Sequence, residues 1–383
     1  MVIVTFPHNE SLINIYKYKV KYLFLKLLSF LYGLGTSLRN ELFNLKILSS
    51  REFDLPVISI GNITVGGTGK TPHTEYIAAL MKTSYKVATL SRGYKRKTSG
   101  FYIVETSSKV AQVGDEPLQM KLKFNDLTVA VDANRVRGIE KLLAMPLKPD
   151  IILLDDAFQH RYVNPGINIL LTDYNHLITK DSLLPYGRLR EFASNKSRAT
   201  IIIVTKCPAE LKPIEERIIT KELEIRPYQN LYFSKIDYGK LIPVFPADAS
   251  LKSVELVEGL TVLMVTGVAD PSSLKDYLMH GSHNIHELSF PDHHAYSIKD
   301  LERIKAKFES LPGVRKIIVT TEKDMVRFRD FGTVAEIISK NMYYIPLKIS
   351  FLNNMGKEFD QKILKYVSEN KSNFNLYSKG NRI

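Results

Sequence analysis

The chain is nearly free of cysteine, since Cys207 is the only thiol in 383 residues. A single thiol excludes internal disulfides and cysteine-rich zinc sites, and it fits a reducing cytosol. The sequence also lacks internal repeats and low-complexity tracts, and its 44% of hydrophobic residues is normal for globular proteins. At about 100–200 residues per domain, the length allows about two domains, each with a real core.

Acidic residues are the other shortage, because 40 Asp and Glu stand against 53 Lys and Arg and leave a net charge of +13. A basic chain of this kind favours an acidic partner, which can be nucleic acid, an anionic membrane surface or a phosphorylated substrate. The alternative is a solvated basic surface without such a partner.

The N-terminal segment has no acidic residue between positions 10 and 41. Its longest uncharged run, 27–38, is too short for the ~20 apolar residues of a spanning helix, and no small-residue cleavage site marks a secretory signal. We expect residues 1–45 to form a helix that lies in an anionic membrane surface, with lysines that snorkel. A helix that covers a domain is the alternative. The basic residues of the segment are Lys17, Lys19, Lys21, Lys26 and Arg39.

Short apolar runs rich in Val and Ile recur from residue 54 onward, among them LPVISI, KVATLS, LTVAVD, DIILLD, INILLTD and ATIIIVT. Helical patterns such as TPHTEYIAALMK and NRVRGIEKLLA separate several of them. Continuous apolar strands that alternate with helices indicate a parallel sheet covered on both faces.

A glycine-rich loop, ISIGNITVGGTGKT, follows the first of these strands and opens a helix. In that context the backbone N–H groups of the loop and of the helix N-terminus face nucleotide phosphates. Lys70 would reach the β and γ phosphates, and the Thr71 hydroxyl would bind Mg²⁺. A strict Walker A motif has glycine at the position of Thr64, and a turn without a ligand is the alternative. The predicted nucleotide-binding residues are Thr64, Val65, Gly66, Gly67, Thr68, Gly69, Lys70 and Thr71.

Two carboxylates, Asp155 and Asp156, end the apolar strand in DIILLDDAFQH. A P-loop enzyme holds its Mg²⁺ at such a strand end, although carboxylates there also cap turns. Which of the two binds the metal is left open. Gln159 and His160 follow in the loop and are expected to face the same crevice.

Two further groups of acids and histidines lie in loops. VGDEPLQM contains Asp115 and Glu116 before a helix pattern, and SFPDHHAYS contains Asp292, His293 and His294 after a strand of the second half. Helix capping explains each group without chemistry. An Asp–His pair from separate segments can deprotonate a hydroxyl, but the sequence alone does not show that the segments meet.

Basic side chains cluster in two more loops, SRGYKRK and LPYGRLRE, which include Arg92, Tyr94 and Arg190. Arginine binds phosphate with two parallel hydrogen bonds, so these loops can clamp phosphate groups; a solvated basic rim is the alternative. A guanine-specific site is disfavoured, because Pro208 follows Thr205–Lys206 where the motif needs Asp.

These patterns predict an α/β fold: a P-loop NTPase-like parallel-sheet domain with a second, smaller α/β domain joined by a β-ribbon linker. The expected divisions are 1–45 for the membrane-docking segment, 46–228 for the nucleotide-binding core, 229–255 for the linker ribbon, 256–350 for the smaller domain, and 351–383 for a C-terminal helix and polar tail.

The motifs GNITVGGTGKTP, SRGY, GDEP, DDAFQH, LPYGRLRE, TGVADP, FPDHH and TEKD, taken together and in this order, resemble the tetraacyldisaccharide 4'-kinases of lipid A biosynthesis. The resemblance runs from about residue 56 to 326, and one difference is Ala157 where the family has glycine. It implies ATP- and Mg²⁺-dependent phosphorylation of the 4'-hydroxyl of a tetraacylated glucosamine disaccharide 1-phosphate. It also implies a place on the cytoplasmic face of the inner membrane, peripheral or monotopic through the N-terminal segment.

The resemblance further implies roles for individual residues. Asp115 would pair with His293 to activate the hydroxyl, and Asp292 would support the histidine. Lys70 would assist the transfer at the phosphates. The metal ligands would be Thr71, Glu116, Asp155 and Asp156. Contacts to nucleotide or sugar phosphate would come from Arg92, Tyr94, Arg135, Gln159, His160 and Arg190.

Two other functions fit parts of the sequence. A membrane-associated P-loop ATPase would drive a protein partner and ignore a lipid acceptor. A nucleic-acid-binding NTPase is suggested by the charge, but a long basic helix and an interleaved aromatic platform are both missing from the sequence. We therefore expect a monomer that binds the lipid A disaccharide precursor and an anionic membrane surface, and no nucleic acid.

Overall fold

The structure is a computed structural model that describes residues 12–245, 253, 255–257, 259–281, 284–332 and 334–380. Within these ranges, nine strands form a large sheet in the order β14–β8–β7–β6–β1–β5–β2–β4–β3. Neighbouring strands are parallel except for the antiparallel pairs β3–β4 and β14–β8 in this described part. The strands are β1 (Val57–Gly61), β2 (Val87–Ser91), β3 (Tyr102–Ile103), β4 (Thr128–Val131), β5 (Ile151–Asp155), β6 (Ile167–Asp173), β7 (Ile201–Thr205), β8 (Asn230–Tyr238) and β14 (Leu347–Phe351).

The central strands are buried on both faces, as their continuous apolar runs predict. Alternate residues of β1 enter different parts of the core: Ile58 belongs to the cluster that contains Ile77 of α2, and Val57 to the cluster that contains Ile139 of α5. Helices on the two faces therefore sandwich the sheet. The predicted α/β class with a parallel sheet is confirmed.

Helices separate many of the strands along the chain, although α3 and α4 follow one another directly, as do α9 and α10. They are α1 (Leu12–Asn44), α2 (Lys70–Met81), α3 (Val110–Val113), α4 (Asp115–Lys123), α5 (Arg135–Leu143), α6 (Pro213–Glu222), α7 (Ser272–Gly281), α8 (Ile298–Ser310), α9 (Glu322–Arg329), α10 (Glu336–Asn341) and α11 (Gly356–Gly380). Short 3-10 turns lie at Ile178–Lys180 and Ala193–Arg198.

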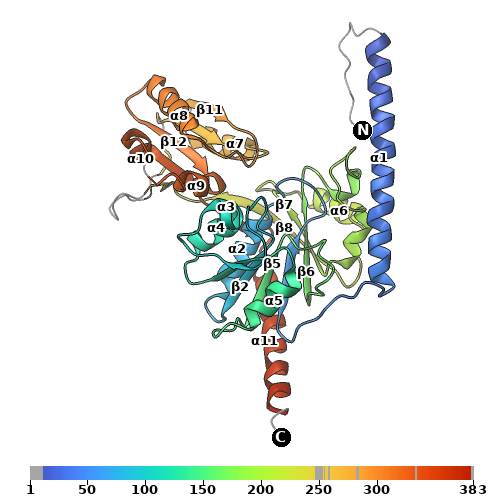
Figure 1. Ribbon diagram of the computed structural model, residues 1–383. Coiled ribbons are helices and arrows are strands. Elements are labelled where there is room, and N and C mark those ends of the chain that lie inside the picture. The colour runs from blue at the N-terminus through green and yellow to red at the C-terminus, as the bar shows by residue number, and fades with distance from the viewer. Residues whose placement is uncertain are drawn as a thin grey trace.

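A smaller sheet lies beside α3 and α4, on the opposite side of the molecule from α1 (Figure 1). Counting described residues only, it has five strands in the order β11–β10–β12–β13–β9. Only β9 is antiparallel to its neighbour in this described set. The strands are β9 (Ile242–Pro243), β10 (Thr261–Thr266), β11 (Asn284–Ser289), β12 (Lys316–Thr321) and β13 (Met342–Ile345).

The chain passes between the two sheets twice, from β8 to β9 and from β13 to β14. The segment expected as a linking ribbon is thus divided: β8 is hydrogen-bonded to β7 inside the large sheet, and β9 is an edge of the small one. β8 joins the large sheet because its central residues are apolar and buried, and because its backbone pairs with that of β7. Residues 246–252 and 254 of the expected ribbon lie outside the described residues.

The two sheets are packed together through α4 and α9. One apolar cluster runs from Ile60 and Met120 on the large side to Phe328 on the small side. A buried group of charges also lies between them, where Lys123 Nζ is 2.6 Å from Glu75 Oε2 and 3.0 Å from Glu322 Oε1. Apolar burial and ion pairing therefore both fix the small sheet against the large one.

Helix α1 runs along the outside of the large sheet and extends past it at its N-terminal end (Figure 1). Ser29 Oγ donates to the Leu183 carbonyl at 3.0 Å, and Tyr32 OH donates to the Arg190 carbonyl at 2.8 Å. In the described part of the chain, no helix is long and apolar enough to cross a membrane. Residues 1–11 of the expected docking segment lie outside the described residues. The exposed large apolar residues of α1 are Tyr22, Leu23, Phe24, Leu27, Phe30, Leu31, Tyr32, Leu34 and Leu38.

Helix α11 projects from the large sheet at the end opposite the small one (Figure 1). Its buried side chains Phe359, Ile363 and Val367 join the main core, and Tyr366 OH donates to the Val57 carbonyl at 3.3 Å. The helix therefore completes the core of the large sheet. Residues 381–383 of the expected tail lie outside the described residues.

Candidate active site

The glycine loop connects the end of β1 to the start of α2. Gly66 and Gly69 have φ angles of 106° and 83°, which only glycine adopts without strain. Gly67 lies between them, and a Cβ there would meet nothing within 4 Å. Lys70 is the first residue of α2, so the loop leads directly into the helix N-terminus, where backbone N–H groups favour an anion.

Side chains and backbone from neighbouring segments hold this loop. Asn62 Nδ2 donates to Thr64 Oγ1 at 3.2 Å and to Thr68 Oγ1 at 2.8 Å. Val65 N donates to the Arg188 carbonyl at 2.8 Å. Thr64, Val65 and Thr68 thus bind protein partners, which leaves the glycines to approach a ligand.

The side chain of His73, in the first turn of α2, holds the start of that helix in place. Its Nδ1 lies 2.7 Å from the Gly69 carbonyl and its Nε2 lies 3.0 Å from Ser234 Oγ. Burial lowers the pKa of His73 to about 4, so the ring is neutral at neutral pH. One hydrogen bond from Ser234 on β8 therefore helps to set the position of the glycine loop.

The two strand-end carboxylates lie next to α2. Thr74 Oγ1 donates to Asp155 Oδ1 at 3.1 Å, and Lys70 Nζ lies 3.7 Å from Asp156 Oδ1. Burial, followed by the charges of Glu116 and Asp156, raises the pKa of Asp155 to about 7. A buried carboxylate with too little positive charge around it is a place where a cation would bind.

The donors at this edge fit Mg²⁺. Thr71 is a buried hydroxyl on the first turn of α2, and Asp155 and Asp156 are hard oxygen donors. No group of three or more His, Cys, Asp or Glu side chains able to hold a metal occurs among the described residues. Mg²⁺ needs no such group, because it usually binds one or two carboxylates and completes its shell with phosphate oxygens and water.

Asp115 and His293 meet across the two sheets. Asp115 is the first residue of α4 on the large side, and His293 follows β11 on the small side with a φ of 58°. His293 Nδ1 lies 3.0 Å from Asp115 Oδ2, and Asp292 Oδ2 lies 3.8 Å from His293 Nε2. The backbone N–H of Glu116 donates to Asp115 Oδ1 at 3.0 Å, so both carboxylate oxygens accept hydrogen bonds.

Arg327 of α9 completes this junction, and the sequence analysis did not identify it. Its Nη2 is paired with Asp115 Oδ2, and its Nη1 lies 2.7 Å from Asp324 Oδ1 and 3.2 Å from the Gly267 carbonyl. The only signal in the sequence is its place three residues after Asp324, one helical turn along α9. Arg327 is buried, and it joins the large sheet to the small one.

These contacts determine the charge of Asp115. Burial acts to raise its pKa, but the hydrogen bond from His293 and the charges of Lys323 and Arg327 together hold the pKa of Asp115 well below its usual range. Lys323 also lies 3.1 Å from His293 Nε2 and 3.4 Å from Glu116 Oε1 through its Nζ. Asp115 is therefore an ionised carboxylate that holds the imidazole of His293 in one orientation.

A second set of predicted residues lies between α1 and the glycine loop. Gln159 Nε2 donates to the Asn62 carbonyl at 2.7 Å and Arg190 Nη1 donates to Gln159 Oε1 at 3.2 Å. Arg190 Nη1 also lies 3.5 Å from Asp156 Oδ1. Gln159 and Arg190 thus join the loop after β5 to the phosphate edge.

The other predicted contact residues are placed differently. Arg135 is buried, and its guanidinium donates to the carbonyls of Asp132 and Asp155, so it braces the ends of β4 and β5. Tyr94 is exposed, with its ring 5.2 Å from the ring of His293. Arg92 is also exposed. His160 lines a cavity whose described lining includes neither the glycine loop nor Asp155.

Comparisons with known proteins agree on one family. The family model described as tetraacyldisaccharide-1-P 4'-kinase matches residues 21–368. A tetraacyldisaccharide 4'-kinase of Phocaeicola vulgatus is 48% identical over 350 residues, which cover 91% of this chain and 96% of that protein. One from Bacteroides thetaiotaomicron is 45% identical over 381 residues, which cover 97% of this chain and 99% of that protein.

A solved structure is also similar. The crystal structure of LpxK from Aquifex aeolicus in complex with ATP has a TM-score of 0.69 and 27% sequence identity to this chain. The match covers 90% of this chain and 99% of that one. Fold and sequence therefore agree over nearly the full length of the relatives.

Proposed function

The chain belongs to the tetraacyldisaccharide-1-P 4'-kinase family, and from that premise we propose how its residues carry out the reaction. Membership makes it a kinase of lipid A biosynthesis that phosphorylates a 4'-hydroxyl with ATP. The proposed acceptor is a tetraacylated glucosamine disaccharide 1-phosphate. The observation that carries the proposed mechanism is the 3.0 Å contact between His293 Nδ1 and Asp115 Oδ2.

The glycine loop, residues 64–71, binds the triphosphate of ATP in this proposal. Its backbone N–H groups and those at the start of α2 surround the phosphates, while Lys70 neutralises the transferred group. Thr71, Asp155, Asp156 and Glu116 are the proposed residues that hold Mg²⁺. Bound there, Mg²⁺ would supply positive charge to the phosphate oxygens.

The Asp115–His293 pair accepts the proton of the 4'-hydroxyl. A bonded carboxylate and imidazole bind one proton as a unit, so the pair rather than either residue is the base. Arg327 keeps Asp115 ionised and in place, and Asp292 faces His293 Nε2. We assign Arg327 and Asp292 as positioning residues.

The acceptor sugar lies, in this proposal, between the base pair and the Gln159–Arg190 pair. Tyr94 and Arg92 are exposed residues of the loop after β2, and the ring of Tyr94 lies next to that of His293. In this proposal both residues contact the disaccharide. Arg190 contacts a phosphate oxygen, because it already lies 3.5 Å from the Asp156 carboxylate. His160 is retained as a proposed contact to nucleotide or sugar phosphate, from the cavity that it lines.

The two sheets are the cores of two domains in this proposal. The division is close to the expected positions, except that β8, expected in the linker, and β14, expected mostly in the smaller domain, both belong to the large sheet. Their shared apolar cluster and the Arg327–Asp115 pair keep them together. The monomer expected from the sequence is retained as a proposal, since the described chain supplies both halves of the base pair.

Helix α1 docks on the cytoplasmic face of the inner membrane. Support comes from its row of exposed Leu and Phe side chains together with Lys26 and Arg39. A substrate with four acyl chains stays in the bilayer, so an enzyme docked on that surface finds it by lateral diffusion.

The direct test is transfer of labelled γ-phosphate from ATP to tetraacyl disaccharide 1-phosphate in detergent micelles. Wild type should yield labelled lipid, and both Asp115→Asn and Lys70→Ala should lose it. Asp126→Asn is the matched control, because its side chain is 61% exposed and is paired with Lys82, which is not one of the proposed site residues. Hydrolysis of ATP without a lipid product would leave the glycine loop correct and the acceptor wrong.

A further inference from the structure

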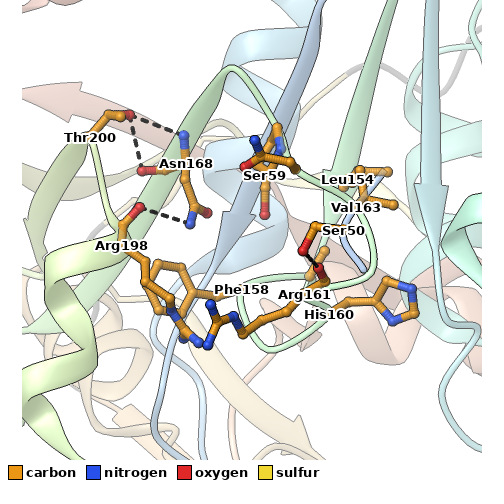
Figure 2. Close-up of a pocket in the computed structure, with 13 residues that line it drawn as sticks. Ser50, Ser59, Leu154, Phe158, His160, Arg161, Val163, Asn168, Arg198 and Thr200 are labelled. Atoms are coloured by element: carbon orange, nitrogen blue, oxygen red, sulfur yellow. Dashed lines mark hydrogen bonds between the residues drawn. The ribbon is translucent and has the colours of Figure 1, made fainter. Parts of the chain in front are cut away.

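A cavity of about 320 Å³ lies between the large sheet and the 157–165 segment (Figure 2). This volume is near the lower limit of small-molecule pockets, ~300 Å³, and would otherwise hold roughly ten waters. No residue of the glycine loop, 64–71, is among the described residues that line it, although His160 is. The lining residues are Ser50, Ser59, Leu154, Ala157, Phe158, His160, Arg161, Val163, Asn164, Pro165, Asn168, Arg198 and Thr200.

The cavity collects polar atoms that have no partner. Within the described residues, Ser59 Oγ, His160 Nε2, Asn168 Oδ1 and Arg198 Nε are buried without a hydrogen bond, and all four side chains line this one cavity. Ser59 is only 2% exposed. Buried polar atoms are normally paired, so four unpaired atoms from separate segments indicate an occupant that pairs them.

The charge of the cavity is positive. Arg161 and Arg198 line it, and no Asp or Glu is found among its described lining residues. The one carboxylate paired with either arginine is that of Glu191, which lies 2.6 Å from Arg198 Nη2 in the described structure. Burial, and then the nearby Arg198, lowers the pKa of Arg161, which is the effect expected where positive charge is in excess.

The two arginines are already oriented. Arg161 Nη1 donates to the Asn40 carbonyl at 2.7 Å and its Nη2 donates to Asn44 Oδ1 at 2.8 Å, both on α1. The Arg198 guanidinium lies over the Phe158 ring, 4.7 Å from its centroid. Binding therefore costs little side-chain entropy, because the long side chains are fixed beforehand.

The cavity also has an entrance. Ser50 and Asn164 line it and are exposed to solvent, whereas Ser59 and Asn168 lie deeper, on β1 and β6. Figure 2 shows Ser59 and Asn168 on the strand side and Arg161 and His160 on the loop side. A solute that enters past Ser50 meets hydroxyl and guanidinium donors from both sides.

We propose that this cavity binds a phosphate-type anion. The donors present, which are one buried hydroxyl and two fixed guanidinium groups, are those that recognise phosphate oxygens, and Asn168 Oδ1 accepts from a protonated oxygen or a bound water. The phosphate belongs either to a small soluble phosphate compound or to the 1-phosphate of the disaccharide. Only the second source rests on the proposed function.

The test measures binding of inorganic phosphate to the full-length protein in detergent by isothermal titration calorimetry. Asn168→Asp puts a negative charge of nearly the same shape into the cavity, and we expect phosphate to bind at least about tenfold more weakly. Ser59→Ala removes one donor and should weaken binding roughly twofold to fivefold. The control is Asn125→Asp, which adds the same charge on an exposed loop and should leave binding unchanged.

The kinase assay separates the two sources. If Asn168→Asp raises KM for the disaccharide 1-phosphate but not for the same lipid without that phosphate, the occupant is the substrate's phosphate. If both KM values are unchanged while phosphate binding is lost, the occupant is a soluble phosphate compound. If the protein binds phosphate but does not phosphorylate the lipid, the inference that the cavity binds phosphate would stand and the proposed function would be refuted.

Two results would overturn the inference. One is an absence of phosphate binding in wild type through the millimolar range. The other is equal binding in wild type, Asn168→Asp and Ser59→Ala, which would mean that the cavity holds only water. A near-ultraviolet circular dichroism spectrum identifies any variant that does not fold, and Ser59→Ala, the smaller change, then decides the question.

Discussion

The junction between the two sheets and the carboxyl edge of the large sheet each bury a carboxylate, but the two respond to burial in opposite ways. The pKa of Asp115 is held well below its usual range, whereas that of Asp155 is raised to about 7. Both side chains are at most 5% exposed, so burial does not distinguish them.

The difference lies in what surrounds each carboxylate. Arg327, Lys323 and His293 provide positive charge and hydrogen bonds to Asp115 from the small sheet. Asp155 has Lys70 nearby, but Glu116 and Asp156 oppose it. The protein therefore supplies the counter-charge at the junction itself, and at the sheet edge it does not, which is where the proposed Mg²⁺ would supply it.

The largest expected effect comes from removing the charge at the junction. Asp115→Asn should lower kcat by ~10²–10⁴-fold, because the imidazole loses the carboxylate that orients it and shares its proton. KM for ATP should stay close to the wild-type value, since Asp115 is bonded to the small sheet and not to the glycine loop. Steady-state kinetics with both substrates checks this, and a large rise in KM for ATP would contradict the separation of the two regions.

The second largest effect is expected from removing the positive charge of Arg327 at the junction. Arg327→Met should lower kcat roughly 10–10²-fold, as expected for the loss of a charge-assisted hydrogen bond of ~1.5–3 kcal/mol. Arg327→Lys should recover part of the loss, because a cation remains beside Asp115. The low-pH limb of the kcat profile should shift to higher pH in Arg327→Met, since Asp115 then binds a proton more readily. If kcat falls but its pH dependence does not shift, Arg327 acts through packing and not through its charge.

The sheet edge makes a pH-dependent prediction. The pKa of Asp155 is raised to about 7, and a metal ligand must lose its proton, so the apparent Mg²⁺ affinity should rise about tenfold per pH unit below 7 and level off above it. Asp155→Asn should remove that slope. Asp126→Asn, measured with the same nucleotide, corrects for the protonation of ATP itself. Equal slopes in both variants would exclude Asp155 as the titrating ligand.

The smallest expected effect concerns the buried charges between α2, α4 and α9. Burial, then repulsion from Glu322, raises the pKa of Glu75 to about 7 against attraction from Lys123. The folded state therefore holds a proton that the unfolded chain has lost, so Glu75 makes the free energy of unfolding fall as pH rises from about 4.5 through about 7.

Glu75→Gln should remove that dependence. Its unfolding free energy should vary by about 1–3 kcal/mol less than that of wild type between pH 5 and 8. Urea unfolding at several pH values measures this difference. Glu369→Gln serves as a surface control, because the side chain of Glu369 is 62% exposed.

The site residues at the carboxyl edge of the large sheet were easier to predict from the sequence than those at the junction between the sheets. The glycine loop and the acids after β5 are each next to their strand in the chain, so local spacing is enough to place them together. Asp115 and His293 are 178 residues apart, and only the family resemblance paired them. Arg327 carried no motif, and its role depends on how α9 packs against α4, which no local pattern encodes.

Two other differences have the same origin. His160 was expected at the crevice because it follows the strand-end carboxylates in the same loop, and Arg135 was a contact implied by the family resemblance alone. The structure turns His160 into the cavity and Arg135 onto backbone carbonyls. Polar residues inside apolar strands, Ser59 and Asn168, were the available signal for the cavity, because a buried polar side chain needs a partner.

The attachment of α1 has a consequence for reach. Tyr32 and Asn40 bind the segment that carries Arg190 and Glu191, so the helix is fixed to the wall of the active site. At ~1.5 Å per residue, the apolar side chains from Leu23 to Leu38 occupy a band roughly 20–25 Å long beside that wall. If α1 docks on the membrane as proposed, it would fix the distance between the membrane surface and the point of phosphate transfer. A lipid whose sugar lies at another height would then be a poorer substrate, whatever contacts its head group makes.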